Sequence, residues 1–105
     1  MTDVDPSRLA SEIGTAAAPL ILDVRSRAEY AAGHVPGAVN IPFWALPWRA
    51  SELNVAPATA IVVYCGHGPR AHMARVVLRR RGFTNVACLA GHMAGWRRAG
   101  RPESR

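Results

Sequence analysis

Residues 60 to 82 form the stretch that most limits how this chain can fold. AIVVYC (60–65) is an unbroken apolar run of strand length, and PRAHMARVVLRRRG (69–82) places its small and apolar residues on one helical face. Gly82 stands where a helix can end in the left-handed conformation. A strand that runs almost directly into a helix is typical of a parallel sheet covered by helices.

The same alternation of strands and helices extends along the whole chain. We predict strands over 19–24, 37–42, 60–65 and 85–90, helices over 6–13, 26–33, 69–82 and 93–100, and a loop with a short helix, interrupted by Pro47, over 43–53. Two helix starts carry their own signals, namely Asp5 before Pro6 and Ser26 followed by Glu29 at capping-box spacing. The pattern predicts an α/β fold with a mostly parallel sheet and helices on both faces.

Length and hydropathy limit the class of protein. A chain of 105 residues is large enough for a hydrophobic core, and we expect one domain over 1–105. Half of the residues are hydrophobic, but no apolar run approaches the ~20 residues that cross a bilayer, so no membrane partner is predicted. The acidic N-terminal segment lacks a secretory pattern, which predicts a cytoplasmic protein. In a reducing cytosol the two cysteines are expected to stay free.

Positive charge is concentrated in the second half of the chain. Residues 1–52 contain six acidic side chains and four arginines, a net charge of −2, whereas residues 53–105 contain nine arginines and one acidic side chain, a net charge of +8. A basic half can bind nucleic acid or attract small anions. No basic helix with interleaved aromatic residues and no RNA-binding signature is present. We therefore predict attraction of small anions and no nucleic-acid partner.

Cys65 ends a predicted strand, at the edge of the sheet where parallel α/β folds bind ligands. Gly66 and Gly68 allow positive φ angles that turn backbone N–H groups inward, and the helix beginning at Pro69 directs its positive end to the same point. A helix N-terminus and a nearby cation lower the pKa of a thiol. The alternative is a buried cysteine that only ends a strand. That alternative does not account for the two glycines, the helix start and Arg70.

Three motifs resemble those of the rhodanese family and follow the family's order. ILDVRSRAEYAAGHVPGAVNIP (21–42) resembles its first signature, and LAGHMAGWRRAGRP (89–102) resembles its C-terminal signature. CGHGPRA (65–71) includes the segment that resembles its six-residue active-site loop, which begins at the cysteine. The resemblance covers nearly the whole chain and implies a five-stranded, mostly parallel sheet flanked by helices on both faces. It also implies sulfurtransferase chemistry, in which a cysteine takes a sulfane sulfur as a persulfide and passes it to cyanide or a thiol.

The resemblance also assigns roles to residues of the loop, with Cys65 as the nucleophile and sulfur carrier. It implies a substrate-binding set of Gly66, His67, Gly68, Arg70 and Ala71, whose N–H groups point inward. The Arg70 guanidinium is expected to hold the sulfonate of thiosulfate or another anionic donor, and the alternative is a first-turn arginine that points to solvent. The expected partners are a small anionic sulfur donor and a thiol or cyanide acceptor, with a protein sulfur acceptor as a further candidate. We predict no cofactor and no metal ligands.

Three more side chains are candidates for the wall of the pocket. Trp44 and Trp48 follow the strand that ends at Pro42, so they are expected at the same edge as Cys65, either as a pocket wall or as an ordinary hydrophobic cap. His92 stands where the family's C-terminal signature has the second glycine of a pair. If that position requires a positive φ, histidine is one of the less penalised replacements, and the fold is expected to survive.

Several other residues are interpreted as structural. Asp23, Arg25, Glu29 and His34 are expected to form a polar cluster that holds the first two strands, Cys88 and Trp96 are expected in the core, and His72 is expected to face solvent.

Two other functions remain open for the same fold. A cysteine–arginine anion loop also suits a phosphatase or an arsenate reductase, and a domain that has lost turnover suits a binding or sensor module. Cysteine phosphatases use a longer loop than GHGP, the four residues that separate Cys65 from Arg70. The intact loop disfavours a module without activity. Sulfur transfer is therefore the predicted function.

Overall fold

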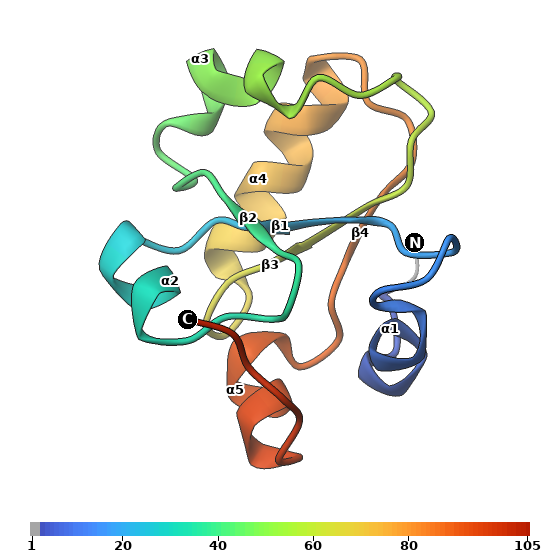
Figure 1. Cartoon of the computed structure of the whole chain (residues 1–105). Helices are drawn as coiled ribbons and strands as arrows, with labels where there is room; N and C mark the ends of the chain where they lie inside the picture. The colour runs from blue at the N-terminus through green and yellow to red at the C-terminus, as the bar shows by residue number, and fades with distance from the viewer. Residues whose placement is uncertain (1–2) are drawn as a thin grey trace.

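The computed structural model describes residues 3–105, in which a central parallel sheet has helices above and below it (Figure 1). The strands are β1 (Leu20–Asp23), β2 (Val39–Asn40), β3 (Ile61–Tyr64) and β4 (Val86–Cys88). The helices are α1 (Pro6–Glu12), α2 (Arg27–Ala32), α3 (Leu46–Arg49), α4 (Pro69–Arg80) and α5 (His92–Arg98), and a 3₁₀ helix, η1 (Ala50–Leu53), follows α3. Each element lies within a segment predicted from the sequence, except that α5 begins one residue early. None of the helices within 3–105 combines the length and the apolar character needed to span a membrane.

The sheet has the strand order β2-β1-β3-β4, and every pair of neighbouring strands is parallel. This confirms the α/β fold, but the expected number of five strands is wrong for residues 3–105. The fifth position is occupied by a single parallel bridge between Val4 and Leu89, with two backbone hydrogen bonds of 2.8 and 2.9 Å on Val4. The strand cannot continue, because Asp5 already caps α1 and Pro6 has no N–H group for a ladder.

Each face of the sheet has its own hydrophobic core. The core beside α3 and α4 includes Leu22, Val63, Leu46, Ala74, Leu78 and Cys65. The core beside α1 and α5 includes Ile21, Val62, Leu9, Met93 and Trp96. Neighbouring strand residues such as Val62 and Val63 enter different cores because successive side chains of a strand point to opposite faces. Trp96 is fully buried, as the sequence predicts.

The capping signals found in the sequence are present at two helix starts. Asp5 is the N-cap of α1, because its Oδ1 accepts a hydrogen bond from the Ser7 N–H group at 2.8 Å, and Pro6 is the first residue of the helix. In α2 the Glu29 N–H group donates to Ser26 Oγ at 3.2 Å, and the Ser26 N–H group donates to Glu29 Oε1 at 3.1 Å. The predicted cap and the predicted capping box are both confirmed.

Two further expectations concern the ends of helices. Pro47 does not interrupt a helix, which corrects the prediction for 43–53. It lies in the first turn of α3, where a backbone N–H group has no partner within the helix, so its absence costs little. Gly82 has a φ of 97° and follows α4 as predicted. The Phe83 N–H group donates back to the Leu78 carbonyl at 3.1 Å, which closes the last turn.

Candidate active site

The loop between β3 and α4 encloses the sulfur atom of Cys65, whose residue surface is only 1% exposed. The Gly68 N–H group donates to Cys65 Sγ at 2.9 Å, and the N–H groups of His67 and Ala71 also hydrogen-bond to the thiol. Gly68 has a φ of 133°, a conformation that favours glycine and turns its N–H group inward. The sulfur therefore lies within a ring of N–H donors, and participation of the Gly66 and Arg70 N–H groups stays a prediction.

This environment makes Cys65 more acidic than an ordinary cysteine. Burial alone would raise the pKa of the thiol, but hydrogen bonds from His92 and from the loop N–H groups stabilise the thiolate and lower the pKa to about 7. At Cys88 burial outweighs the attraction of Arg75 and Arg79 and raises the pKa of that thiol. Both cysteines are free and buried. Cys65 thus ionises to the nucleophilic thiolate more readily than an ordinary cysteine, whereas Cys88 stays a neutral core side chain.

Arg70, in the first turn of α4, is held by Glu29 from α2. Arg70 Nη1 donates to Glu29 Oε1 at 2.7 Å, and Nη2 donates to Oε2 at 3.2 Å. The Arg70 hydrogen bonds outweigh burial and hold the pKa of Glu29 at about 2. The pKa of Arg70 is raised chiefly by Glu29, and it is raised further by its interaction with Cys65. The guanidinium group is therefore fixed close to the sulfur and does not point freely into solvent.

Gly66 is needed for a reason that the sequence did not indicate. It is absent from the glycines with positive φ, which corrects the expectation that both loop glycines adopt that conformation. A Cβ atom at Gly66 would lie 3.2 Å from Arg70 Nη2, which is closer than most real Cβ contacts. Gly66 therefore leaves room for the guanidinium group, whereas Gly68 provides the turn.

His92 reaches the same site from the start of α5. Its φ is 52°, so this position does adopt the left-handed conformation, and the residue is only 6% exposed. His92 Nδ1 accepts a hydrogen bond from the Cys65 N–H group at 3.3 Å. A Cβ atom at Gly68 would lie 3.4 Å from His92 Nε2, so the far side of the ring packs against the loop. His72, exposed on α4, meets His92 edge-on, with ring centroids 6.2 Å apart.

The buried ion pair between Asp23 and Arg25 lies beside Tyr64, the last residue of β3. Arg25 Nη2 lies 2.7 Å from Asp23 Oδ2 and also donates to the Gly33 carbonyl at 2.8 Å. The Tyr64 hydroxyl donates to the same carboxylate at 2.8 Å. Because Tyr64 directly precedes Cys65, these contacts fix the backbone from which the loop departs.

Only two of the four residues expected in the polar cluster belong to it. Glu29 instead binds Arg70, as described above. His34 stacks on Tyr30 with ring centroids 3.7 Å apart, and its Nδ1 lies 2.8 Å from the Tyr30 carbonyl oxygen. The backbone of His34 also pairs with that of Ser104. His34 therefore holds α2 and the C-terminal segment, and it takes no part in the Asp23–Arg25 pair.

Trp44 and Trp48 lie on the surface, with exposed fractions of 61% and 66% and ring centroids 6.5 Å apart. Phe43, the preceding residue, is the one that packs against the core. An ordinary hydrophobic cap would bury the two indoles, so the exposed pair does not fit that alternative. Their role as a pocket wall stays a prediction.

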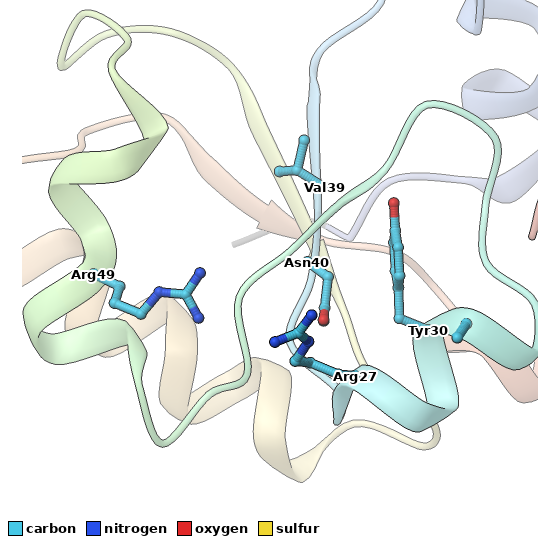
Figure 2. A pocket seen from close by; sticks show the side chains of 6 residues that line it. Arg27, Tyr30, Val39, Asn40 and Arg49 are labelled. Atoms are coloured by element: carbon cyan, nitrogen blue, oxygen red, sulfur yellow. The ribbon is translucent and has the colours of Figure 1, made fainter.

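A separate cavity of about 520 Å³ lies at the outer edge of the sheet, between α2, β2 and α3 (Figure 2). It is lined by Arg27, Tyr30, Ala31, Val39, Asn40 and Arg49. Figure 2 shows the guanidinium groups of Arg27 and Arg49 extending toward each other across it. Arg49 is already paired with Glu52 at 2.9 Å. The loop 65–70 does not line this cavity, which is therefore distinct from the cysteine site. No group of three or more histidine, cysteine or acidic side chains within 3–105 is arranged to hold a metal ion.

The fold and the site together define a class of protein. A parallel α/β sheet carries, at the carboxyl end of a central strand, a cysteine enclosed by backbone N–H groups and followed by a helix. Residues 5–99 match the family model described as the rhodanese-like domain. The chain belongs to the rhodanese-like domain family.

Known relatives support the same placement. A protein named sulfurtransferase from Allochromatium vinosum is 30% identical over 97% of this chain and 94% of its own length. The thiosulfate sulfurtransferase GlpE from Pseudomonas fluorescens is 36% identical over 74% of this chain and 70% of its own length. The crystal structure of the Alr3790 protein from Anabaena sp. is similar with a TM-score of 0.86 and 34% identity, over 96% of this chain and 80% of that chain.

Proposed function

We propose that this protein is a sulfurtransferase that moves a sulfane sulfur from thiosulfate, or from another persulfide donor, to cyanide or a thiol. The observation that carries the proposal is the ring of N–H groups around Cys65 Sγ, in which the Gly68 nitrogen lies at 2.9 Å. The sulfurtransferase names of two relatives support the same chemistry. A cytoplasmic location, a single domain over 1–105 and a protein thiol as a further acceptor belong to the same proposal.

In the first half-reaction the Cys65 thiolate attacks the outer sulfur of thiosulfate. The sulfur–sulfur bond of thiosulfate breaks, and its electron pair leaves with sulfite. Cys65 then carries a persulfide whose terminal sulfur bears the negative charge. The N–H ring and the positive end of α4 stabilise that charge, because their dipoles point toward it before the reaction begins.

In the second half-reaction cyanide or an acceptor thiolate attacks the terminal sulfur of the persulfide. The bond between that sulfur and Cys65 Sγ breaks, its electron pair returns to Cys65, and thiocyanate or a new persulfide leaves. No external oxidant, reductant or cofactor is needed, because one sulfur atom moves between two nucleophiles.

The side chains near the loop have separate roles in the proposal. Arg70 binds the sulfonate oxygens of thiosulfate, since Glu29 holds its planar guanidinium group beside the sulfur. Trp44, Trp48 and His92 are proposed to form parts of the wall of the approach to Cys65. Cys88 has no chemical role because its thiol pKa is raised, whereas the N–H groups around Cys65 lower the pKa of that thiol.

Phosphate or arsenate chemistry on this loop is disfavoured by the small size of the ring. A phosphoryl group needs donors for three equatorial oxygens and an open line of attack for the thiolate. Here the Gly68 N–H group already points at the sulfur from 2.9 Å, and GHGP provides only four residues between Cys65 and Arg70. The ring therefore suits one terminal sulfur atom better than a tetrahedral anion.

The intact mass of the protein after incubation with thiosulfate tests the proposal. We expect the parent chain to gain one sulfur atom and to lose it again when cyanide is added, with formation of thiocyanate. Cys65→Ser should not gain the sulfur, whereas the matched variant Cys88→Ser should behave like the parent. Phosphate release from an aryl phosphate that depends on Cys65, without any thiocyanate, would overturn the sulfurtransferase assignment in favour of a phosphatase.

A further inference from the structure

The hydrogen bond that His92 Nδ1 accepts determines which nitrogen of the ring carries the proton. Nδ1 accepts the Cys65 N–H group at 3.3 Å, so Nδ1 is unprotonated in this arrangement. In a neutral imidazole the proton must then reside on Nε2, which becomes a donor. Nε2 faces Gly68, whose own N–H group donates to Cys65 Sγ. The imidazole therefore contacts both the backbone of Cys65 and the loop residue whose N–H group donates to the sulfur.

The position of His92 is fixed by the backbone as well as by packing. With a φ of 52° and 6% exposure, the residue begins α5 directly after Gly91, which itself has a φ of 77°. The backbone of α5 is tied to the loop, since the Met93 N–H group donates to the Cys65 carbonyl at 3.0 Å. The start of α5 is therefore held against Cys65, and the buried imidazole is held with it.

The other ionisable groups around the pair lie on α4 and on the loop. Arg70, paired with Glu29, interacts with the sulfur, and His72 touches the His92 ring edge-on. His67 is in the loop and is exposed. Of these groups Arg70 is the one that interacts with the sulfur, whereas His92 is the imidazole that accepts the Cys65 N–H group.

We propose that His92 is a catalytic residue for the sulfur-donating step, in which its Nε2–H group hydrogen-bonds to Cys65 Sγ and stabilises the departing thiolate. This rests on the function proposed above. When an acceptor thiolate attacks the outer persulfide sulfur, the bond to Sγ breaks and the electron pair moves onto Sγ. Nε2–H then donates to a full negative charge, and the proton stays on the imidazole.

The expected effect of His92 differs between the two half-reactions. A hydrogen bond to the thiolate makes Cys65 a better leaving group, because a less basic thiolate departs faster. The same bond makes Cys65 a weaker nucleophile per thiolate, which partly offsets the larger thiolate fraction when thiosulfate is attacked. Sulfur donation should therefore depend on His92 more strongly than sulfur loading does.

Three substitutions at position 92 distinguish a role of His92 as a hydrogen-bond donor from a role in the shape of the pocket. His92→Gly removes the ring and suits the positive φ, while His92→Asn tolerates that φ but cannot place a donor as far out as Nε2. His92→Gln can place an amide N–H donor near the position of Nε2. His72→Gln is the matched control, since it changes a neighbouring imidazole that is exposed on α4. Circular dichroism and thermal unfolding select the variants that fold.

Two measurements are made on each folded variant. The first is the pH dependence of Cys65 alkylation, which does not require sulfur transfer. The second is the rate at which preloaded persulfide passes its sulfur to cyanide, compared with the rate of loading by thiosulfate at a pH where Cys65 is fully ionised. We expect Gly and Asn at position 92 to move the alkylation inflection upward and to slow donation about tenfold, with a smaller change in loading. Gln should recover part of the donation rate, and the His72 control should match the parent.

The outcomes also distinguish this inference from the proposed function. If the parent acquires no persulfide from thiosulfate, the sulfurtransferase proposal fails, while the alkylation profiles still decide whether His92 bonds to the sulfur. If the parent transfers sulfur and all three variants keep its alkylation inflection and its donation rate, the role of His92 is refuted. Equal slowing of loading and donation in every folded variant would refute it too, because it would indicate a role in pocket shape alone.

Discussion

At the scale of single residues, the site depends on side chains that bind each other across long stretches of sequence. Arg70 is oriented by Glu29, which lies on a different helix, and both oxygens of that carboxylate accept from the guanidinium group. His92 accepts the backbone N–H group of Cys65 and lowers the pKa of its thiol. Cys65 thus combines local N–H donors with two side chains whose positions are set elsewhere.

The role proposed for Arg70 predicts a change in substrate affinity. Arg70→Lys keeps the positive charge but loses both the bidentate pairing with Glu29 and the remaining guanidinium N–H groups that would bind sulfonate oxygens, so we expect KM for thiosulfate to rise about tenfold with a smaller change in kcat. Steady-state kinetics with thiosulfate and cyanide provide the measurement. Arg75→Lys, on the same helix, is the control and should be unchanged. An unaltered KM in Arg70→Lys would mean that the anion binds elsewhere.

The Glu29–Arg70 pair also predicts how stability depends on pH. Glu29 has a folded pKa of about 2, below its ordinary value of 4.5, so its contribution to stability is complete above about pH 5 and is lost as the pH falls toward 2. The Glu29 side chain is 39% exposed, so solvent screening limits the contribution to about 1 kcal/mol. Urea unfolding between pH 5 and pH 2 should show a smaller loss of stability in Glu29→Gln than in the parent. Identical pH profiles would show that the pair contributes nothing to folding.

At the scale of secondary-structure elements, α2 links local capping to the active site. Glu29 Oε1 accepts from the Ser26 N–H group at 3.1 Å and from Arg70 Nη1 at 2.7 Å. The capping box could be predicted from the sequence because both partners lie within one helical turn. The bond to Arg70 could not, because it depends on how α2 and α4 are placed by the sheet.

Removal of the cap should therefore destabilise the fold. In Ser26→Ala the Glu29 N–H group loses its partner, and we expect a loss of about 1 kcal/mol in the free energy of unfolding. The midpoint of thermal unfolding should fall by about 4–8 °C. Ser11→Ala is a suitable control, because Ser11 is exposed and its hydroxyl donates only to the Arg8 carbonyl of the same helix. Equal midpoints for Ser26→Ala and the parent would show that water replaces the cap without cost.

At the scale of the whole molecule, the sequence predicts the order of elements better than it predicts their contacts. Short apolar runs, helix caps and glycine helix ends are local signals, and they placed every element of the sheet and its covering helices. The expected fifth strand was reduced to one bridge at Val4, because the start of α1 competes for the same residues. In the site, the sequence indicated Cys65 and its loop, but the space that Gly66 leaves for Arg70 and the contact between His92 and Cys65 depend on tertiary packing.

Hydrogen bonds hold the C-terminal segment, residues 101–105, against the rest of the fold, and they lead to a prediction about the stability of the whole molecule. The Trp96 indole N–H group donates to the Pro102 carbonyl at 2.7 Å, and Ser104 exchanges two backbone hydrogen bonds of 2.8 and 2.9 Å with His34. With about 1 kcal/mol for each of these bonds, deletion of 101–105 should lower the free energy of unfolding by about 3 kcal/mol.

Urea and thermal unfolding of the 101–105 deletion provide the measurement, and the midpoint of thermal unfolding should fall by on the order of 10–20 °C. Deletion of Arg105 alone is the control, because that residue is exposed. The alkylation profile of Cys65 should stay that of the parent at temperatures where the shortened chain is folded, since the segment binds α5 and His34 and not the cysteine loop. A shortened chain with the stability of the parent would show that these bonds are replaced by water, and that Trp96 holds α5 through packing alone.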